Sequence, residues 1–200
     1  ETDQKTDVLN SAYAWSFDLQ RINLEQIGLD YHTKELAFTI KQDLLHVDIE
    51  KIDFNNQTLA IAKLESKNLY TSVPILPSNK GGPSILPDLG WKATINKLEM
   101  YHRLIEIGDT ELTRISELNF KAQELDYHAD SLMIDIRELN GNYNDQLKLQ
   151  EGSAKLSIHQ NKIDANKITL RTSSDQIIAD QLSVGLDSKT YDLRKVNSDI

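Results

Sequence analysis

The sequence predicts an all-β protein with a long, strongly curved, mostly antiparallel sheet. Apolar and polar residues alternate in many short runs, which is typical of strands with one apolar and one polar face. The alternation repeatedly slips by one residue, as a β-bulge would cause, and bulges bend and coil a sheet. Short turn signals recur at roughly hairpin spacing.

Residues 1–14 are expected to be a lead-in, and residues 15–73 a first β segment. Its alternating runs are Phe17/Leu19, Leu36/Phe38/Ile40, Leu45/Val47/Ile49 and Leu59/Ile61. Three-residue steps follow, from Leu19 to Ile22, from Ile49 to Ile52 and from Ile61 to Leu64. In a regular strand such a step would turn the second apolar side chain to the wrong face, so each step predicts a bulge or a corner.

Residues 74–90 are expected to connect two strand-rich halves. All four prolines of the chain lie here, together with Gly81, Gly82 and Gly90. The apolar pairs Ile75-Leu76 and Ile85-Leu86 indicate that the connection lies against the body of the protein.

Residues 91–200 are expected to form a second β segment with an additional hairpin. The alternation continues at Ile134/Ile136, Leu147/Leu149, Leu156/Ile158, Ile168/Leu170 and Leu182/Val184/Leu186, with a further slip from Ile136 to Leu139. The turn signals of the whole chain are Asn55-Asn56, Asn140-Gly141-Asn142, Glu151-Gly152-Ser153, Ser173-Ser174-Asp175 and Asp187-Ser188.

The two halves show signs of a repeat. Each opens on a tryptophan, Trp15 and Trp91, and each carries the tetrapeptide Leu-Asp-Tyr-His, at 29–32 and 125–128. The tryptophans are interpreted as packing anchors at strand ends.

An amphipathic helix over 109–139 is the competing interpretation of one segment. Apolar residues there recur in steps of three and four, and Asn140-Gly141 would end a helix well. The repeat favours strands, because the partner segment 29–40 alternates with period two.

The expected strands number about fourteen to sixteen, and an open sheet of that size would curl, split or close. The chain has 4 Phe, 7 Tyr and 2 Trp among 200 residues, so most of its apolar residues are aliphatic. Since no polar group is expected on the inward positions, the pattern suits a ligand bound through its hydrocarbon.

Composition excludes several functions. The formal charge of −9 argues against nucleic acid, and the lack of cysteine excludes thiolate metal sites and cysteine nucleophiles. No apolar stretch is long enough for a transmembrane helix. The abrupt ends suggest a segment of a longer protein.

No catalytic, metal-binding or cofactor-binding set emerges from the motifs. The five histidines His32, His46, His102, His128 and His159 lack the spacing of metal ligands. The carboxylates Asp30, Asp126, Asp130 and Asp135 are expected on a solvated outer face. Serines lack the elbow motif of hydrolases, so we expect a protein that is not an enzyme.

The stretch from Leu147 to Asp180 resembles the repeating β-segments of TamB-like proteins, within the wider AsmA-like group and closest in style to Bacteroidota members. Leu89–Met100, Asn119–His128 and the segment from Trp15 are similar in style. The resemblance implies a β-taco fold, in which the long curved sheet is folded into a U-shaped trough with an apolar interior. It implies a periplasmic bridge of a Gram-negative bacterium, anchored at the inner membrane. It also implies phospholipid passage between membranes and a part in outer-membrane protein assembly, with partners reached through regions outside this chain.

On this interpretation an apolar groove holds phospholipid acyl chains, without nucleic acid, metal or cofactor. The residues expected to line it are Phe38, Ile40, Val47, Ile49, Ile61, Ile134, Ile136, Leu147, Leu149, Leu156, Ile158, Ile168, Leu170, Leu182 and Val184. The alternative is a β-sandwich interaction or adhesin-type module of a surface or secreted protein, with two compact domains joined at the Pro-rich connection.

Overall fold

The computed structural model describes residues 19–32, 37–73, 90–108, 112–128, 131–159, 162–185 and 190–199. These residues form one 11-stranded sheet and contain no helix, so the all-β prediction is confirmed. The strands are β1 (Arg21–His32), β2 (Ala37–Asp53), β3 (Thr58–Val73), β4 (Lys92–Ile107), β5 (Thr113–His128), β6 (Ser131–Tyr143), β7 (Leu147–Leu149), β8 (Glu151–His159), β9 (Lys162–Arg171), β10 (Gln176–Gly185) and β11 (Thr190–Asp199).

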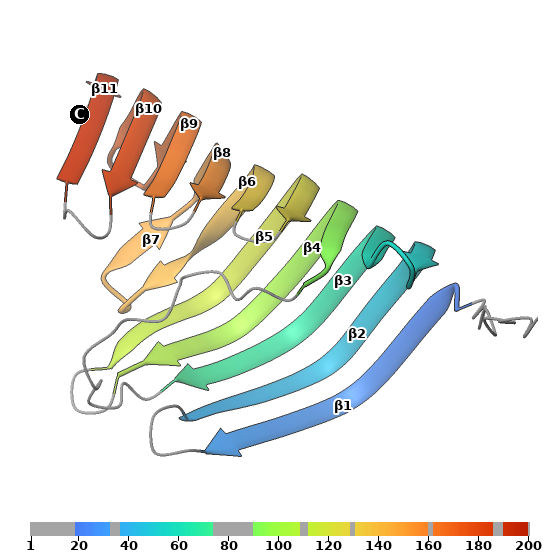
Figure 1. Cartoon of the computed structure of the whole chain (residues 1–200). Coiled ribbons are helices and arrows are strands. Elements are labelled where there is room, and N and C mark those ends of the chain that lie inside the picture. Colours follow the sequence, from blue (N-terminus) through green and yellow to red (C-terminus); the bar gives the residue numbers. More distant parts are fainter. Residues whose placement is uncertain are drawn as a thin grey trace, which may run out of the picture.

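The strands lie side by side in chain order, from β1 at one edge to β11 at the other (Figure 1). Every pairing is antiparallel except that of β3 with β4, which is parallel from Thr58 opposite Lys92 to Val73 opposite Ile107. The short β7 pairs only with the end of β6. The halves 15–73 and 91–200 therefore contribute to one sheet, and the described residues do not form the two packed sheets of a sandwich.

The strands are fewer and longer than the alternating runs predict. The described residues form 11 strands, against about fourteen to sixteen expected for the chain, and β2 alone has 17 residues. The reason is that a slip in the alternation marks a bulge inside a strand, across which pairing continues, and not the end of that strand.

Most of the predicted bulges are confirmed. The pairing of β2 with β3 shifts at Ile49 and passes over Ala62, which are the steps from Ile49 to Ile52 and from Ile61 to Leu64. The pairing of β5 with β6 shifts between Ile136 and Glu138, within the step from Ile136 to Leu139. Leu19 precedes β1, so no pairing tests the first step.

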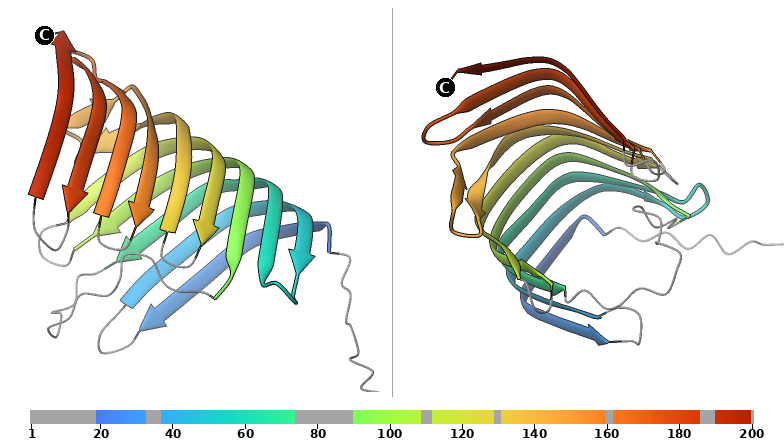
Figure 2. Two further views of the ribbon diagram at one scale, coloured as in Figure 1. Left: turned by 45° about the horizontal axis from the view of Figure 1, so that its top comes forward. Right: turned by 90° about the vertical axis from the view of Figure 1, so that its left-hand side faces the viewer.

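Several strand residues adopt the left-handed conformation that bulges use. Inside strands, positive φ values occur at Gln26 (54°), Asn68 (52°), Glu117 (52°), Glu124 (53°) and Lys167 (53°). The longer strands bend along their length, all in the same direction (Figure 2). Bulges are the local cause of such bending, because the extra residue tilts the strand and increases its twist.

Two of the predicted turns are confirmed. Between β2 and β3 the Asp53 carboxylate accepts hydrogen bonds from the backbone and side-chain amides of Asn56, and Gln57 has a φ of 52°. Between β9 and β10 the hydroxyl of Thr172 accepts a hydrogen bond from the Asp175 amide at 3.0 Å. Asp187-Ser188 lies outside the described residues.

Two predicted turns are wrong, because their glycines serve close approach between strands. Asn140-Gly141-Asn142 lies within β6, and Glu151-Gly152-Ser153 lies within β8. A Cβ at Gly141 would be 3.2 Å from the Cα of Leu118, and one at Gly152 would be 3.2 Å from the Cβ of Leu139. The turn after β6 instead occupies residues 144–146.

The helix alternative for 109–139 is also wrong, since β5 and β6 occupy its described residues. Both copies of Leu-Asp-Tyr-His end a strand, β1 and β5. Trp91 immediately precedes β4 and packs edge-on against Phe54, with ring centroids 5.8 Å apart, as expected of an anchor at a strand end. Trp15 lies outside the described residues.

Candidate functional site

One face of the sheet is a continuous series of apolar rows. Side chains that lie opposite each other in paired strands share a face, so the register defines each row. One row crosses seven neighbouring strands as Ile22, Val47, Leu64, Leu98, Ala122, Ile136 and Ala154. Ala154 packs against the cluster that contains Ile168 and Ala179, and Val196 faces Ala179. The row thus reaches both edges of the sheet.

A second row crosses eight strands. It runs from β2 to β10 as Ile52, Leu59, Ala93, Tyr127, Leu132, Ile158, Ile163 and Val184. Between these two rows lie Ile61, Ile95, Leu125, Ile134, Leu156, Ala165 and Leu182. Ile61 is buried, and the other six belong to or pack against two hydrophobic clusters, one around Leu98 and Ala122 and one around Ile168 and Ala179. We call the side of the sheet that carries these rows the apolar face.

The residues predicted to line a groove all belong to the apolar face. Val47 and Ile136 lie in the first row, Ile158 and Val184 lie in the second, and most of the others lie between or beside these rows in register. Ile40 lies opposite Leu29 and Thr71, two residues from Phe38. Leu147 and Leu149 of β7 lie opposite Tyr143 and Gly141 of β6, at the margin of the sheet.

The middle of the apolar face is buried without a second layer over the described sheet. Ala122 in β5 is 1% exposed and Leu98 in β4 is 7% exposed, whereas Leu29 in β1 is 49% exposed and Val196 in β11 is 43% exposed. A small side chain therefore occupies the most crowded of these positions, and aliphatic side chains remain accessible toward the edges. The rows given above contain no aspartate, glutamate, lysine or arginine.

A polar group on this face was missed by the sequence analysis. Gln42 and Ser66 are buried and hydrogen-bonded to each other at 2.8 Å, and the amide of Gln42 also donates to the Leu44 carbonyl. His102 is 6% exposed, and its Nε2 lies 3.0 Å from the hydroxyl of Thr71. Burial lowers the pKa of the His102 imidazole below its ordinary 6.5, so the ring is neutral at pH 7.

The opposite side of the sheet, which we call the polar face, carries charged rows. One row crosses every strand except β7, as Arg21, Asp48, Lys63, Lys97, Gln123, Asp135, Lys155, Asn166, Gln181 and Arg194. Acidic and basic side chains mix along it, so this row of described residues is hydrated and forms no concentrated basic patch.

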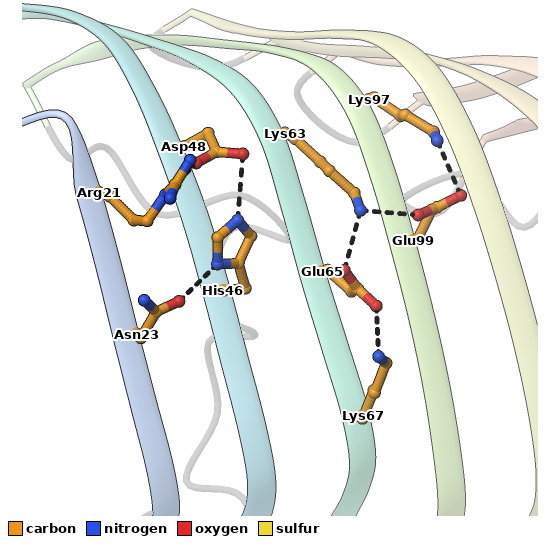
Figure 3. A network of polar contacts seen from close by, with 9 residues as sticks. All are labelled: Arg21, Asn23, His46, Asp48, Lys63, Glu65, Lys67, Lys97 and Glu99. Carbon is orange, nitrogen blue, oxygen red and sulfur yellow. Dashed lines mark hydrogen bonds and ion pairs between the residues drawn. The ribbon is translucent and has the colours of Figure 1, made fainter.

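Ion pairs link neighbouring strands on the polar face (Figure 3). Glu65 accepts hydrogen bonds from Lys63 at 2.8 Å and Lys67 at 2.7 Å, and Lys63 also reaches Glu99 at 3.3 Å. The ammonium groups of Lys63 and Lys67 lower the pKa of the Glu65 carboxyl from 4.5 to about 2. Hydrogen bonds to the Asp48 carboxylate hold its pKa below the ordinary value. The bond from Arg21 has the larger effect, and the bond from His46 has the next largest.

The expectation that Asp135 is solvated is wrong. Its side chain is 8% exposed, and Oδ2 lies 2.8 Å from Arg137 and 2.9 Å from Lys155. The carboxylate is held between two cations on the polar face, which offsets the cost of its burial. Asp30, by contrast, is exposed and accepts a hydrogen bond from Thr39.

The histidines are scattered over the sheet. His32, His128 and His159 end β1, β5 and β8, whereas His46 lies on the polar face beside Asp48. Among the described residues, no three histidine, aspartate or glutamate side chains form a group that could hold a metal ion.

Among the residues that the structure describes, no helix is long and apolar enough to cross a lipid bilayer. Comparison with models of protein families, with curated proteins and with solved structures finds no match to this chain. The arrangement of side chains is therefore the basis for assigning a function.

Proposed function

We propose that this chain is a non-enzymatic segment of a TamB-like, AsmA-like envelope bridge in the periplasm of a Gram-negative bacterium. Its apolar face holds phospholipid acyl chains as they pass between the inner and outer membranes. The same passage supports assembly of the outer membrane. The observation that carries the proposal is the first apolar row, which extends from Ile22 in β1 to Val196 in β11.

The proposal includes a U-shaped trough with the apolar face on its concave side. Two observations support it. The strands bend in a common direction, and bulges recur within them (Figure 2). The apolar face also buries Ala122 and Leu98 in a single-layered sheet, as expected where side chains of a concave wall converge.

The chemistry of the apolar face favours an acyl chain over a compact polar ligand. The rows offer mainly leucine, isoleucine, valine and alanine, which contact hydrocarbon without hydrogen bonds. Each methylene that leaves water contributes about 0.8 kcal/mol. Rows that extend from strand to strand would let a chain slide, because no single position holds it by a directed bond.

The test is to place a charge on the apolar face and a matched charge on the polar face. Ile158→Glu changes a half-buried residue of the second row, and Ser157→Glu changes its neighbour, which lines a polar-face hollow with Lys155 and Asp135. We expect Ile158→Glu to lower phospholipid binding at least about tenfold, because a carboxylate is costly to bury against hydrocarbon. Ser157→Glu should bind like the unchanged protein.

The measurement is mass spectrometry of lipid that copurifies in mild detergent, followed by titration with a fluorescent phosphatidylethanolamine. Circular dichroism confirms that both variants keep their strands. An unchanged protein that carries and binds no phospholipid would contradict the proposal, as would equal loss of binding in both folded variants.

A further inference from the structure

The polar face contains a hollow of about 740 Å³ beside the hairpin formed by β6 and β7. Its floor is a row of three residues on neighbouring strands, in which Tyr101 lies opposite Asn119 and Asn119 lies opposite Asn140. The complete lining is Tyr101, Glu117, Asn119, Lys121, Asn140, Gly141, Asn142, Lys148, Leu149 and Gln150. Neither the lipid proposal nor the apolar face involves these polar side chains.

Hydrogen bonds orient the amides of this hollow. The Nδ2 atoms of Asn119 and Asn140 both donate to the carboxylate of Glu138, at 2.6 Å and 3.3 Å. The Nδ2 of Asn142 donates to Glu117 at 3.0 Å. Since each NH2 group is bound to a carboxylate, the amide oxygens are the groups available to accept hydrogen bonds. The hollow therefore suits a ligand with several hydroxyl donors.

Tyr101 supplies an aromatic surface at the rim. It is 40% exposed, although its strand is central in the sheet. A second hollow of about 470 Å³ shares Tyr101 and Glu117 and is otherwise lined by Asn68, Arg103, Leu104 and Ser116. The bulge residues Asn68 and Glu117 lie on the strands that flank Tyr101. Two hollows that meet at one tyrosine suit a linear ligand that crosses the ring.

The charges of the two linings are mixed, which favours a neutral ligand over a polyion. Arg103 and Lys148 add cations, Glu117 adds a carboxylate, and Lys121 is paired with Glu138 at 2.6 Å. The chain as a whole has a formal charge of −9, which repels polyanions. Amide oxygens that accept hydrogen bonds, an exposed aromatic ring and a lining of mixed charge together point to sugar rings.

We propose that these two hollows bind a neutral oligosaccharide. One sugar ring stacks on Tyr101, and the hydroxyl groups of the oligosaccharide donate hydrogen bonds to the amide oxygens and to Glu117. Aromatic rings bind apolar ligand faces well at low entropic cost, and nearby hydrogen bonds set the orientation. The proposal stands independently of lipid binding.

The experiment titrates the isotope-labelled protein with maltotetraose, cellotetraose, xylotetraose and chitotetraose, and records amide chemical shifts. Spermidine and inorganic phosphate serve as charged probes. At least one tetrasaccharide should shift the amide resonances of Tyr101, Glu117 and Asn142 in the unchanged protein. Tyr101→Ala should weaken that binding at least tenfold, and Glu117→Gln should weaken it severalfold.

Tyr143→Ala is the matched control, because Tyr143 is an exposed tyrosine of the apolar face, 47% accessible. Its removal should leave sugar binding unchanged. The proposal is overturned if no tetrasaccharide shifts the amides of the two hollows, if spermidine or phosphate shifts them instead, or if Tyr143→Ala weakens binding as much as Tyr101→Ala. Phospholipid binding is measured on the same samples, so the two proposals fail or hold separately.

Discussion

At the scale of single residues, His102 makes the stability of the sheet depend on pH near neutrality. Its pKa is lowered in the folded protein, so the unfolded chain takes up a proton first as pH falls below 6.5. Stability is therefore full above pH 6.5 and decreases below it. We expect the urea midpoint to fall between pH 7.5 and pH 5.5, and His102→Gln to reduce that fall. His128→Gln, an exposed change at the end of β5, should retain it.

Glu65 also makes the stability of the fold decrease as pH falls, but in a lower pH range. Because its folded-state pKa is about 2 and its ordinary value is 4.5, its ion pairs stabilise the fold above pH 4.5. That contribution is lost as pH falls from 4.5 toward 2. Glu65→Gln should make acid unfolding, followed by circular dichroism, less steep in this range than Glu25→Gln, which changes an exposed residue of β1. Equal curves would contradict the assignment.

The sequence predicts the apolar residues of the apolar face better than it predicts the polar residues that lie among them. Val47, Ile136 and Leu156 are found in alternating runs, and the register brings them to one side. The same reasoning does not place Gln42 and His102 on this face. A three-residue step separates Gln42 from the next inward residue, Leu45, and another separates His102 from Ile105. Without knowing where each bulge falls, the face of a polar residue beside it is undetermined.

At the scale of elements, the bulges carry backbone strain that substitution can test. Glu124 has a φ of 53° within β5, a conformation that costs a residue with a side chain about 1–2 kcal/mol. Glu124→Gly should leave stability unchanged or raise it by up to about 1 kcal/mol, since glycine adopts this conformation freely but loses more entropy on folding.

Glu124→Val is the informative counterpart, because a β-branched side chain tolerates positive φ worst. We expect it to lower the free energy of unfolding, measured in urea, by more than about 1 kcal/mol. A valine variant as stable as the glycine variant would show that this residue is not held in the left-handed conformation.

The elements also show where sequence reasoning ends. The periodicity predicts strands and the three-residue steps predict bulges, but neither shows whether pairing continues past a step. Gly141 and Gly152 resemble turn residues in the sequence, yet they lie within strands where a Cβ would come within 3.2 Å of a neighbouring residue, a tight contact. Close approach depends on the partner strand, so it is a tertiary property that a local pattern does not contain.

At the scale of the whole molecule, each strand depends mainly on its two neighbours. The Leu98 and Ala122 cluster lies centrally, whereas Leu24 and Leu29 of β1 are 44% and 49% exposed. We expect amide hydrogen exchange to be slowest in β4 and β5 and fastest in β1 and β11. Uniform protection across the sheet, measured by mass spectrometry, would contradict this gradient.

The order of the strands also determines how the sheet would respond to mechanical load. Its long axis runs from β1 to β11, perpendicular to the strands, so the backbone hydrogen bonds point along that axis. Tension applied between the two edges would load those bonds lengthwise and separate one ladder at a time, instead of shearing many bonds together. A sheet loaded in this direction yields gradually when the distance between its two edges increases.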